Sequence, residues 1–404
     1  MLILERWIGE DSNKSWNFEA GEVKPAMDGI AGFMGEHLKA VLHVDLEGKK
    51  KKVHLFLKRL PMYNKDKAKF MDKQHFFERE KLMFNITFSP ISDPKPCCVK
   101  AYIYTDSMIV MPDLTAEGYT STNYLYTLDL EHILVVSATI ARFHAGLVNY
   151  ETKKSIDQKR PYNTFEEYGY MLIETMCESK WLNTVSKVSV SMLKAFSSKD
   201  YGNLADLESQ LRSKLAEACA TLTVYKDTLN VLLHRDPWAN NIMFNYENNV
   251  PVNAVLVDYQ LIRYGPPAFD LMLLLNLTTD RNFREKRENE VFDYYYSLFV
   301  NYLNEDSKAR LEGLGYDKEK FLSWCERARM FGMLVTLAIY PIVLMDPKTA
   351  QSTFDDPETF DKNLFEDRSE PVLAYANTNE IYKQRNLAII EEFIERYVLI
   401  KKNV

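Results

Sequence analysis

The segment from His234 to Asp258 constrains the fold of this chain more than any other. It contains the pattern H-x-D-x-x-x-x-N at His234, Asp236 and Asn241, then an apolar run at 254–257, and then Asp258. Asn241 follows Asp236 by five positions, so a tight loop can turn both side chains into one cleft. The 22 positions from Asp236 to Asp258 leave room for a short β-hairpin that returns the chain to the same place.

These residue types match the groups that phosphoryl transfer from ATP requires. Asp236 is the predicted catalytic residue, because its carboxylate would accept a hydrogen bond from an acceptor hydroxyl and orient it for in-line attack. Asn241 and Asp258 are the predicted ligands of Mg²⁺, which prefers hard oxygen atoms and takes only one or two from protein. Asn240 is the rival of Asn241, and the spacing favours Asn241.

Two other residues are expected to support the catalytic loop without reacting. His234 belongs to the catalytic motif, and we expect it to bond a neighbouring carbonyl or the metal-binding strand and so fix the loop geometry. Asp270 opens an apolar helix-like segment after a Gly-Pro-Pro turn. We expect its side chain to cap that helix and brace the loop.

The pattern along the chain predicts an α+β, bilobal protein kinase-like fold. Residues 1–112 form the expected small β-rich N-lobe, and residues 113–404 form the larger, mainly helical C-lobe with the acceptor pocket. The predicted strands are 38–46, 53–59, 102–104, 108–111, 241–244 and 254–257. The predicted helices are 67–84, 128–148, 165–196 (with a break), 204–223, 267–277, 286–303, 318–344 and 377–400, and 346–367 is expected to be an irregular loop.

The N-lobe supplies candidates for binding the nucleotide phosphates. Lys58 shares one face of a strand-like run with Phe56, so it can face a cleft and reach the phosphates. Glu80, on the helix-like segment 67–84, is the expected partner that holds Lys58 in place. Glu78 is the rival, and the two glutamates lie about 200° apart around a helix, so only one can face the cleft.

A glycine pattern near the N-terminus is a second candidate for phosphate binding. Gly29, Gly32 and Gly35 recur at every third position before a strand-like run. Their backbone amides could approach a phosphate without obstruction by side chains. The pattern has low specificity, and a flexible surface turn is the alternative interpretation.

Residues 110–114 are the predicted hinge between the lobes. Adenine would be held by the carbonyl of Met111 and the N–H of Asp113. Pro112 has no N–H of its own, stiffens the hinge, and leaves both of these groups free.

Composition excludes several classes of protein. The net charge of −7 gives no electrostatic footprint for nucleic acid. The N-terminus lacks the pattern of a signal peptide, and the longest uncharged apolar stretch, 331–345, is 15 residues broken by Pro341, which predicts a buried helix. Five scattered cysteines without metal-site spacing fit a reducing compartment. We therefore expect a cytoplasmic monomer that binds neither nucleic acid nor membrane.

The segment 234–274, read as HRDPWANNIMF…VLVDYQLIRYGPPAFDLMLL, resembles the ecdysteroid kinase-like proteins of insects. These belong to the wider choline kinase/aminoglycoside phosphotransferase group, with a CHK kinase-like domain. The segments 77–80 and 140–145 and the Asp-Leu hinge are similar to that family too. The family usually has a small residue at the position of Arg235 and a leucine at that of Pro237, but no group needed for transfer is missing here.

The resemblance implies a kinase-like fold, with ATP and Mg²⁺ as co-substrates and a small-molecule alcohol as acceptor. The acceptor would be an ecdysteroid or, in a detoxification enzyme, a hydroxylated xenobiotic. Two alternatives are a choline- or aminoglycoside-type kinase with a cationic acceptor and a non-catalytic kinase-fold binding protein. Aromatic residues of the C-lobe are expected to be mostly core, with a few lining the acceptor pocket: Phe292, Tyr294, Tyr295, Tyr296, Phe299, Trp324, Phe331 and Tyr340.

Overall fold

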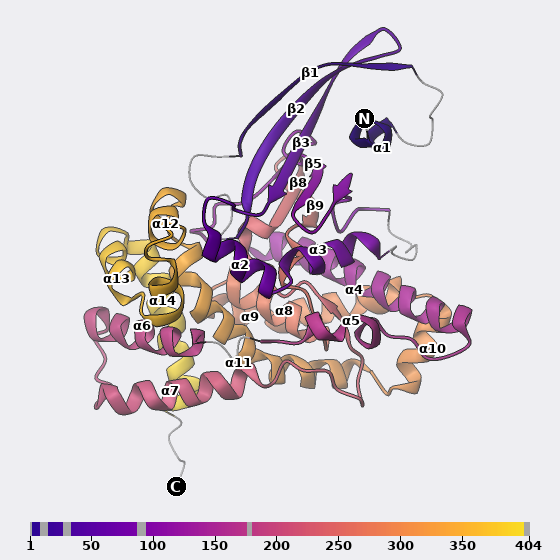
Figure 1. The fold of residues 1–404 in the computed structure, drawn as a ribbon. Coiled ribbons are helices and arrows are strands. Elements are labelled where there is room, and N and C mark those ends of the chain that lie inside the picture. Colours follow the sequence, from indigo (N-terminus) through magenta and orange to yellow (C-terminus); the bar gives the residue numbers. More distant parts are fainter. Residues whose placement is uncertain (1, 9–14, 27–33, 87–93, 176–179, 400–404) are drawn as a thin grey trace.

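The structure is a computed structural model that describes residues 2–8, 15–26, 34–86, 94–175 and 180–399. Its N-terminal part is built on an antiparallel sheet, which lies at the top of Figure 1. Within the described residues the strand order is β1-β2-β3-β5-β4. The strands are β1 (Trp16–Pro25), β2 (Glu36–Leu46), β3 (Lys49–Arg59), β4 (Ile103–Tyr104) and β5 (Met108–Pro112), and α1 (Leu2–Ile8) packs against β2 and β3.

The hairpin of β2 and β3 carries Lys58. Its turn is formed by Glu47 and Gly48, whose φ angles of 52° and 77° are both positive. The lysine run 49–52 follows this turn and is exposed, as expected for a solvated hairpin tip. Lys58 lies at the other end of β3, where its side chain is buried.

The predicted helix at 67–84 is in fact two helices, α2 (Lys65–Lys73) and α3 (Phe76–Asn85). His75 lies between them with φ 58° and ψ 31°, a left-handed conformation that a continuous right-handed helix cannot contain. The break changes the direction of the chain before α3 begins. On α3, Glu80 is buried and contacts Lys58 of β3.

The rest of the chain is mainly helical, as predicted, around the long helix α4 (Leu130–Gln158). This is the one helix in the described ranges that is long and apolar enough by itself to cross a membrane, and 83% of its most apolar window is buried in the fold. Its apolar side chains therefore belong to the core. The other helices are α5 (Thr164–Leu172), α6 (Trp181–Phe196), α7 (Leu204–Cys219), α8 (Ala268–Thr278), α9 (Arg281–Tyr302), α10 (Glu305–Gly313), α11 (Lys318–Val343), α12 (Pro347–Phe354), α13 (Ser369–Thr378) and α14 (Glu380–Phe393).

The uncharged stretch 331–345 forms the second half of α11 and is largely buried, as predicted. Pro341 lies inside the helix, which ends two residues later at Val343. Proline removes one backbone hydrogen bond of a helix, which favours termination nearby. The carbonyl of Pro341 accepts a hydrogen bond of 2.8 Å from the hydroxyl of Tyr382 on α14, so the end of α11 is fixed by another helix.

A second sheet carries the hairpin predicted after the catalytic loop. Strands β8 (Ile242–Glu247) and β9 (Val250–Leu256) are antiparallel, and β6 (Tyr119–Thr120) pairs with the other edge of β8. Asn248 and Asn249 form the turn with positive φ angles of 51° and 66°, a conformation that suits the twist of hairpin strands. The hairpin therefore leads the chain from the catalytic loop back to Asp258.

The prediction of an irregular loop at 346–367 is wrong, because this stretch contains α12 and the π-helical turn η4 (Lys362–Glu366). Asp346 caps α12 and Pro347 occupies its first turn, a combination that starts helices. The buried ammonium of Lys67 on α2 lies 2.6 Å from the carboxylate of Asp355. This ion pair joins the N-terminal part of the chain to the C-terminal helices.

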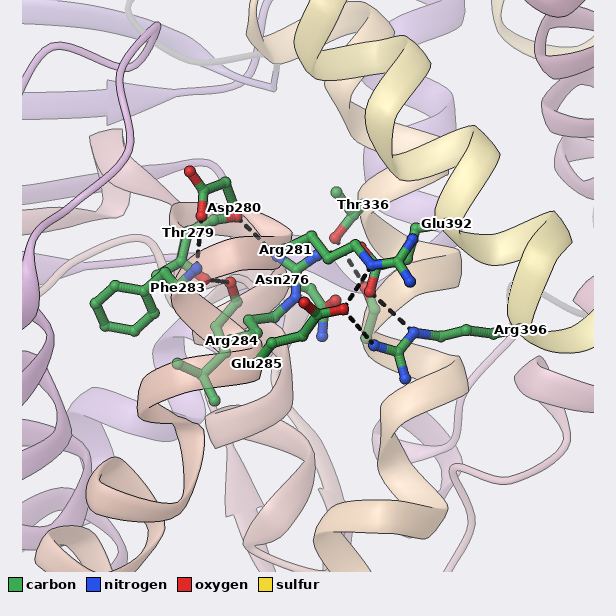
Figure 2. Close-up of polar contacts among 12 residues, drawn as sticks. Asn276, Thr279, Asp280, Arg281, Phe283, Arg284, Glu285, Thr336, Glu392 and Arg396 are labelled. Carbon is green, nitrogen blue, oxygen red and sulfur yellow. Dashed lines mark hydrogen bonds and ion pairs between the residues drawn. The ribbon is translucent and has the colours of Figure 1, made fainter. Parts of the chain in front are cut away.

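Figure 2 shows the polar network that fixes the last helices against α9. The guanidinium of Arg284 on α9 donates to the carbonyl of Thr279 at 2.8 Å and pairs with Glu392 on α14. Arg396 donates to the same carboxylate at 3.0 Å and lies 3.9 Å from Glu285. Arg284 and Glu392 are both buried, so this pair is shielded from water.

The cysteines agree only in part with the expectation of scattered free thiols. Cys97, Cys98 and Cys325 are free, and Cys325 is buried. Cys219, at the end of α7, is disulfide-bonded, so the expectation is wrong at this position. The scattered spacing of the cysteines along the sequence gave no signal for this bond.

Candidate active site

A buried carboxylate holds the loop that follows β7 (Val231–Leu233). Asp270, in the first turn of α8, accepts hydrogen bonds from the backbone N–H groups of His234 at 2.6 Å and Arg235 at 2.7 Å. The ring of His144 lies 3.1 Å from the same carboxylate. Arg235 has φ 70°, a left-handed conformation that favours glycine, which gives a physical reason for a small residue at this position. The geometry fits the bracing role expected for Asp270, whereas the cap position of α8 is occupied by Pro267.

His234 links the catalytic loop to the residue that precedes Asp258. Its Nε2 lies 2.9 Å from the carbonyl oxygen of Val257, and its Nδ1 lies 3.3 Å from the backbone nitrogen of Asp236. A carbonyl can only accept and an amide N–H can only donate, so this geometry assigns the ring proton to Nε2. Burial lowers the pKa of His234 and favours the same neutral form. These contacts suit the supporting role predicted for His234.

Asp236 and Asn241 face each other across the loop. The amide nitrogen of Asn241 donates to Oδ2 of Asp236 at 2.8 Å and to its backbone oxygen at 2.9 Å. Its amide oxygen therefore remains as the atom that could bind a metal. Asn241 is buried, whereas its rival Asn240 is only partly buried. Burial, together with the negative charge of Asp258, raises the pKa of Asp236 well above its usual range.

Lys58 connects β3 to both α3 and the metal-binding candidate. Its ammonium lies 2.7 Å from the carboxylate of Glu80 and 2.6 Å from that of Asp258, and it donates to the side chain of Gln260 at 3.1 Å. Burial opposes its charge, but the two carboxylates outweigh that effect and raise the pKa of Lys58. Glu78, the rival of Glu80, instead contacts His75 and Tyr170 near the surface.

The charges around Lys58 fit a divalent cation. One ammonium stands against the carboxylates of Glu80, Asp258 and Asp236, which leaves an excess of buried negative charge. In the described part of the chain, no group of three or more His, Cys, Asp or Glu side chains could hold a metal. Mg²⁺ in phosphotransfer sites needs few protein ligands, because phosphate oxygens and water complete its shell. Asn241 and Asp258 can supply an amide oxygen and a carboxylate.

The predicted glycine-rich segment is seen only at its last position. Gly29 and Gly32 lie outside the described residues. Gly35 has φ 84°, and an added Cβ would lie 3.3 Å from the side chain of Lys58. The backbone conformation therefore favours glycine here, and the close approach of Lys58 leaves little room for a Cβ.

The predicted hinge register is wrong at Asp113. Its N–H donates to the carbonyl of His54 at 3.0 Å and so is not free to hold adenine. Met111 is paired with Phe56 inside the sheet. The carboxylate of Asp113 forms an ion pair of 2.8 Å with Lys39. The ladder between β3 and β5 continues past Pro112, so the groups thought to be free are used by the sheet.

A cavity borders the catalytic loop between the N-terminal part and the C-terminal helices. Asp236, Asn241 and Asp258 line it, whereas neither Met111 nor Asp113 does so among the described residues. The cavity therefore lies beside Asp236 and is not lined by the residues predicted to hold adenine. Its walls are mostly apolar and come from Met34, Phe70, Phe76, Trp181, Trp238, Leu261, Ile339, Ile342, Val343 and Phe365.

The aromatic residues of this wall are not those that the sequence suggested. Of the eight candidates, none lines the cavity, and Tyr294 is exposed. The others belong to the main core or pack against it, as expected for most of them. Trp181 and Phe365 lie far apart in the sequence and on different helices, so no local pattern could have joined them.

The chain is similar to one protein family and to several solved structures of low sequence identity. The model of the ecdysteroid kinase-like family matches residues 29–306. A solved structure of the GDP and kanamycin complex of APH(2")-IIia is 10% identical over 93% of each chain, with a TM-score of 0.38. The structure of a microcompartment-associated aminopropanol kinase is 11% identical over 93% of this chain and 95% of that chain, with a TM-score of 0.30. No curated protein sequence matches significantly.

The family match covers well over half of the chain. The sheet-containing N-terminal part and the larger helical part form the α+β, kinase-like fold that the sequence predicts. The boundary at residues 112 and 113 stays a prediction, as do the roles of the individual site residues. The chain belongs to the ecdysteroid kinase-like family.

Proposed function

We propose that this protein is an ATP- and Mg²⁺-dependent kinase that phosphorylates a hydroxyl group of a small, largely apolar alcohol. The observation that carries the proposal is the convergence of Asp236, Asn241 and Asp258 at one cavity, with Lys58 bound to both Glu80 and Asp258. An ecdysteroid or a hydroxylated xenobiotic is the acceptor class that the family suggests.

The contacts support the following roles. The carboxylate of Asp236 would accept a hydrogen bond from the acceptor hydroxyl and align its oxygen with the γ-phosphorus. The bond from that oxygen to phosphorus forms as the bond to the leaving ADP oxygen breaks. Lys58, held by Glu80, would bind phosphate oxygens. Mg²⁺, held by Asn241 and Asp258, would supply positive charge where negative charge develops.

A cationic acceptor, as in choline- or aminoglycoside-type kinases, suits the cavity less well. Its charged lining includes Arg235 and Arg263 and the carboxylates of Glu174, Asp236 and Asp258. In the proposed mechanism Asp236 and Asp258 are used by the acceptor hydroxyl and the metal, and the two guanidiniums beside Glu174 would repel an ammonium group. A kinase-fold protein that only binds ligands would have no need for the full set of catalytic groups, and turnover decides between these possibilities.

The test is transfer of labelled phosphate from ATP and Mg²⁺ to a panel of ecdysteroids, hydroxylated plant toxins, choline and an aminoglycoside. For Asp236→Asn we expect a loss of kcat of about 10²- to 10⁴-fold for any substrate that the wild type phosphorylates, because the amide cannot take the proton. Asp317→Asn is the matched control, since Asp317 caps α11 at the surface and asparagine caps equally well. If ATP binds by calorimetry but the wild type phosphorylates no acceptor, the binding-protein interpretation replaces this proposal.

A further inference from the structure

The cavity wall beside Asp236 contains a cluster of buried guanidinium groups. Arg235 donates from Nε to Oε2 of Glu174 at 2.9 Å, and its Nη2 lies 2.8 Å from the same oxygen. Nε of Arg263 lies 3.7 Å from that oxygen as well. Glu174, Arg235 and Arg263 expose at most 4% of their side chains, and all three line the cavity. Two arginines of the wall thus converge on one oxygen of one carboxylate.

Among the described residues, this cluster contains more guanidiniums than carboxylates, even when Asp236, which interacts electrostatically with Arg235, is counted beside Glu174. A third guanidinium, that of Arg79 on α3, is buried nearby and donates to the carbonyls of Met171 at 2.6 Å and Gln260 at 3.3 Å. Burial lowers the pKa of both Arg79 and Arg263, and repulsion from neighbouring guanidiniums lowers it further. Among the described residues, Glu174 is the carboxylate that forms ion pairs with both Arg235 and Arg263. Buried charge in excess of its partners is costly, and an anion in the cavity would compensate for it.

Arg263 has a donor without an acceptor. Its Nη1 donates to the carbonyls of Leu261 at 3.3 Å and Ile262 at 2.9 Å. Its Nε is buried and has no hydrogen-bond partner in the described part of the chain, because 3.7 Å to Glu174 is too long for a hydrogen bond. Buried donors are nearly always satisfied in native proteins. A buried, unsatisfied donor on a residue that lines a cavity marks a position for an acceptor group of a ligand.

We propose that Arg235 and Arg263 bind a carboxylate carried by the acceptor alcohol. The inference rests on the proposed function, because it names the class of alcohol: a largely apolar hydroxy acid whose hydroxyl faces Asp236. Guanidinium groups recognise carboxylates through strong, charge-assisted hydrogen bonds. Glu174 occupies part of this anion site when no acceptor is bound, and its negative charge competes with that of the ligand.

Binding of matched acids and esters to the full chain tests the inference. The probes are deoxycholate, below its micelle-forming concentration, and 12-hydroxydodecanoate, each beside its methyl ester, measured by calorimetry. We expect the wild type to bind each acid about tenfold or more tightly than its ester, as a charged hydrogen bond would give. Arg263→Gln should lower the affinity for each acid far more than that for its ester and so remove most of the preference, whereas Arg263→Lys should keep part of it.

Glu174→Gln supplies the opposite change at the same site. Removing the competing carboxylate should raise the affinity for the acids about tenfold and leave the esters unchanged. Ester affinity also reports whether each variant is folded, so a loss for the acid alone cannot come from unfolding. Equal affinity of the wild type for acid and ester, or no measurable binding of either acid, overturns the inference. An acid preference that neither variant changes also overturns it.

Phosphate transfer from labelled ATP to the same acids and esters separates this inference from the proposed function. Preferred binding of the acids without transfer to any of the four compounds would support the anion site and contradict the assignment as a kinase of such alcohols. Transfer to acid and ester with equal KM would support the kinase and overturn the anion site. A lower KM for the acids that depends on Arg263 would support both.

Discussion

The two sides of Asp236 carry opposite excesses of charge. On the side of the β-sheet, the ammonium of Lys58 is outnumbered by carboxylates, with Glu80 at 2.7 Å and Asp258 at 2.6 Å. On the side of the cavity wall, within the described ranges, the carboxylate of Glu174 is paired with two guanidiniums, those of Arg235 and Arg263. Each excess is buried, where charge without a partner is costly.

This difference indicates what each side is prepared to bind. An excess of carboxylates suits Mg²⁺ with its nucleotide, and an excess of guanidiniums suits an anionic group of the acceptor. Asp236 lies between them, and its pKa is raised by burial and by Asp258 and lowered by Arg235. The catalytic carboxylate thus lies at the boundary between two sites of opposite sign, and substitutions on the two sides should have separable effects.

The largest effect that would test this separation is expected for Asp258→Asn. Loss of a carboxylate at the predicted metal site should lower kcat about 10³-fold for every acceptor, because charge stabilisation of the transferring phosphoryl group is lost. A titration of transfer rate against Mg²⁺ concentration should shift to higher concentration. On the other side, Arg263→Gln should leave kcat for a methyl ester unchanged. If Asp258→Asn retains wild-type kcat, the metal site is not where we place it.

The next effect concerns Asp270, which supports the loop that both sides share. Asp270→Asn should destabilise the fold by about 2 kcal/mol, because a buried side chain that accepts two backbone N–H groups would place an amide donor against one of them. Urea denaturation measures this change, and kcat should fall for acids and esters alike. Asp317→Asn is again the control. A variant that is as stable as the wild type would show that the loop does not depend on this carboxylate.

The catalytic loop and its hairpin were predictable because their information is local. The spacing of Asp236, Asn241 and Asp258 in the sequence sets how far a loop and a two-residue turn can carry the chain. The choice between Glu78 and Glu80 was not local in this sense. It depends on which face of α3 packs against Lys58 of β3. The left-handed residue His75 was not predictable either, because it interrupts a segment whose composition is that of one continuous helix.

Other features could not be read from the sequence because they depend on tertiary contacts. The N–H of Asp113 donates to the carbonyl of His54, on a strand more than fifty positions earlier. The local sequence around Asp113 could not show that this N–H is already hydrogen-bonded. Strand β1 is an edge strand exposed on nearly every residue and therefore lacks alternating apolar positions. The meeting of Glu174 with Arg235 and Arg263 joins the segment after α5, the catalytic loop and β10 (Arg263–Gly265), which no single segment reveals.

The smallest expected effect is on the free energy of unfolding, which the buried carboxylate of Asp236 makes dependent on pH. Because its pKa is raised in the folded chain, the folded state binds this proton more tightly than the unfolded state does. Its contribution to stability is therefore present at low pH and is lost as the pH rises through the folded pKa. Asp236→Asn removes the ionisable group. Without nucleotide, we expect this variant to be more stable than the wild type at about pH 8, with the difference shrinking towards about pH 4.

Urea denaturation at several pH values measures this difference, with Asp317→Asn as the control for the Asp-to-Asn change itself. A difference that is the same at every pH would contradict the raised pKa of Asp236. If the variant is less stable than the wild type at high pH, the charged carboxylate is stabilised in the empty site. The negative charge beside Lys58 would then not destabilise the fold in the absence of Mg²⁺ and nucleotide. The contrast between the two sides of Asp236 would be supported by the arginine cluster alone.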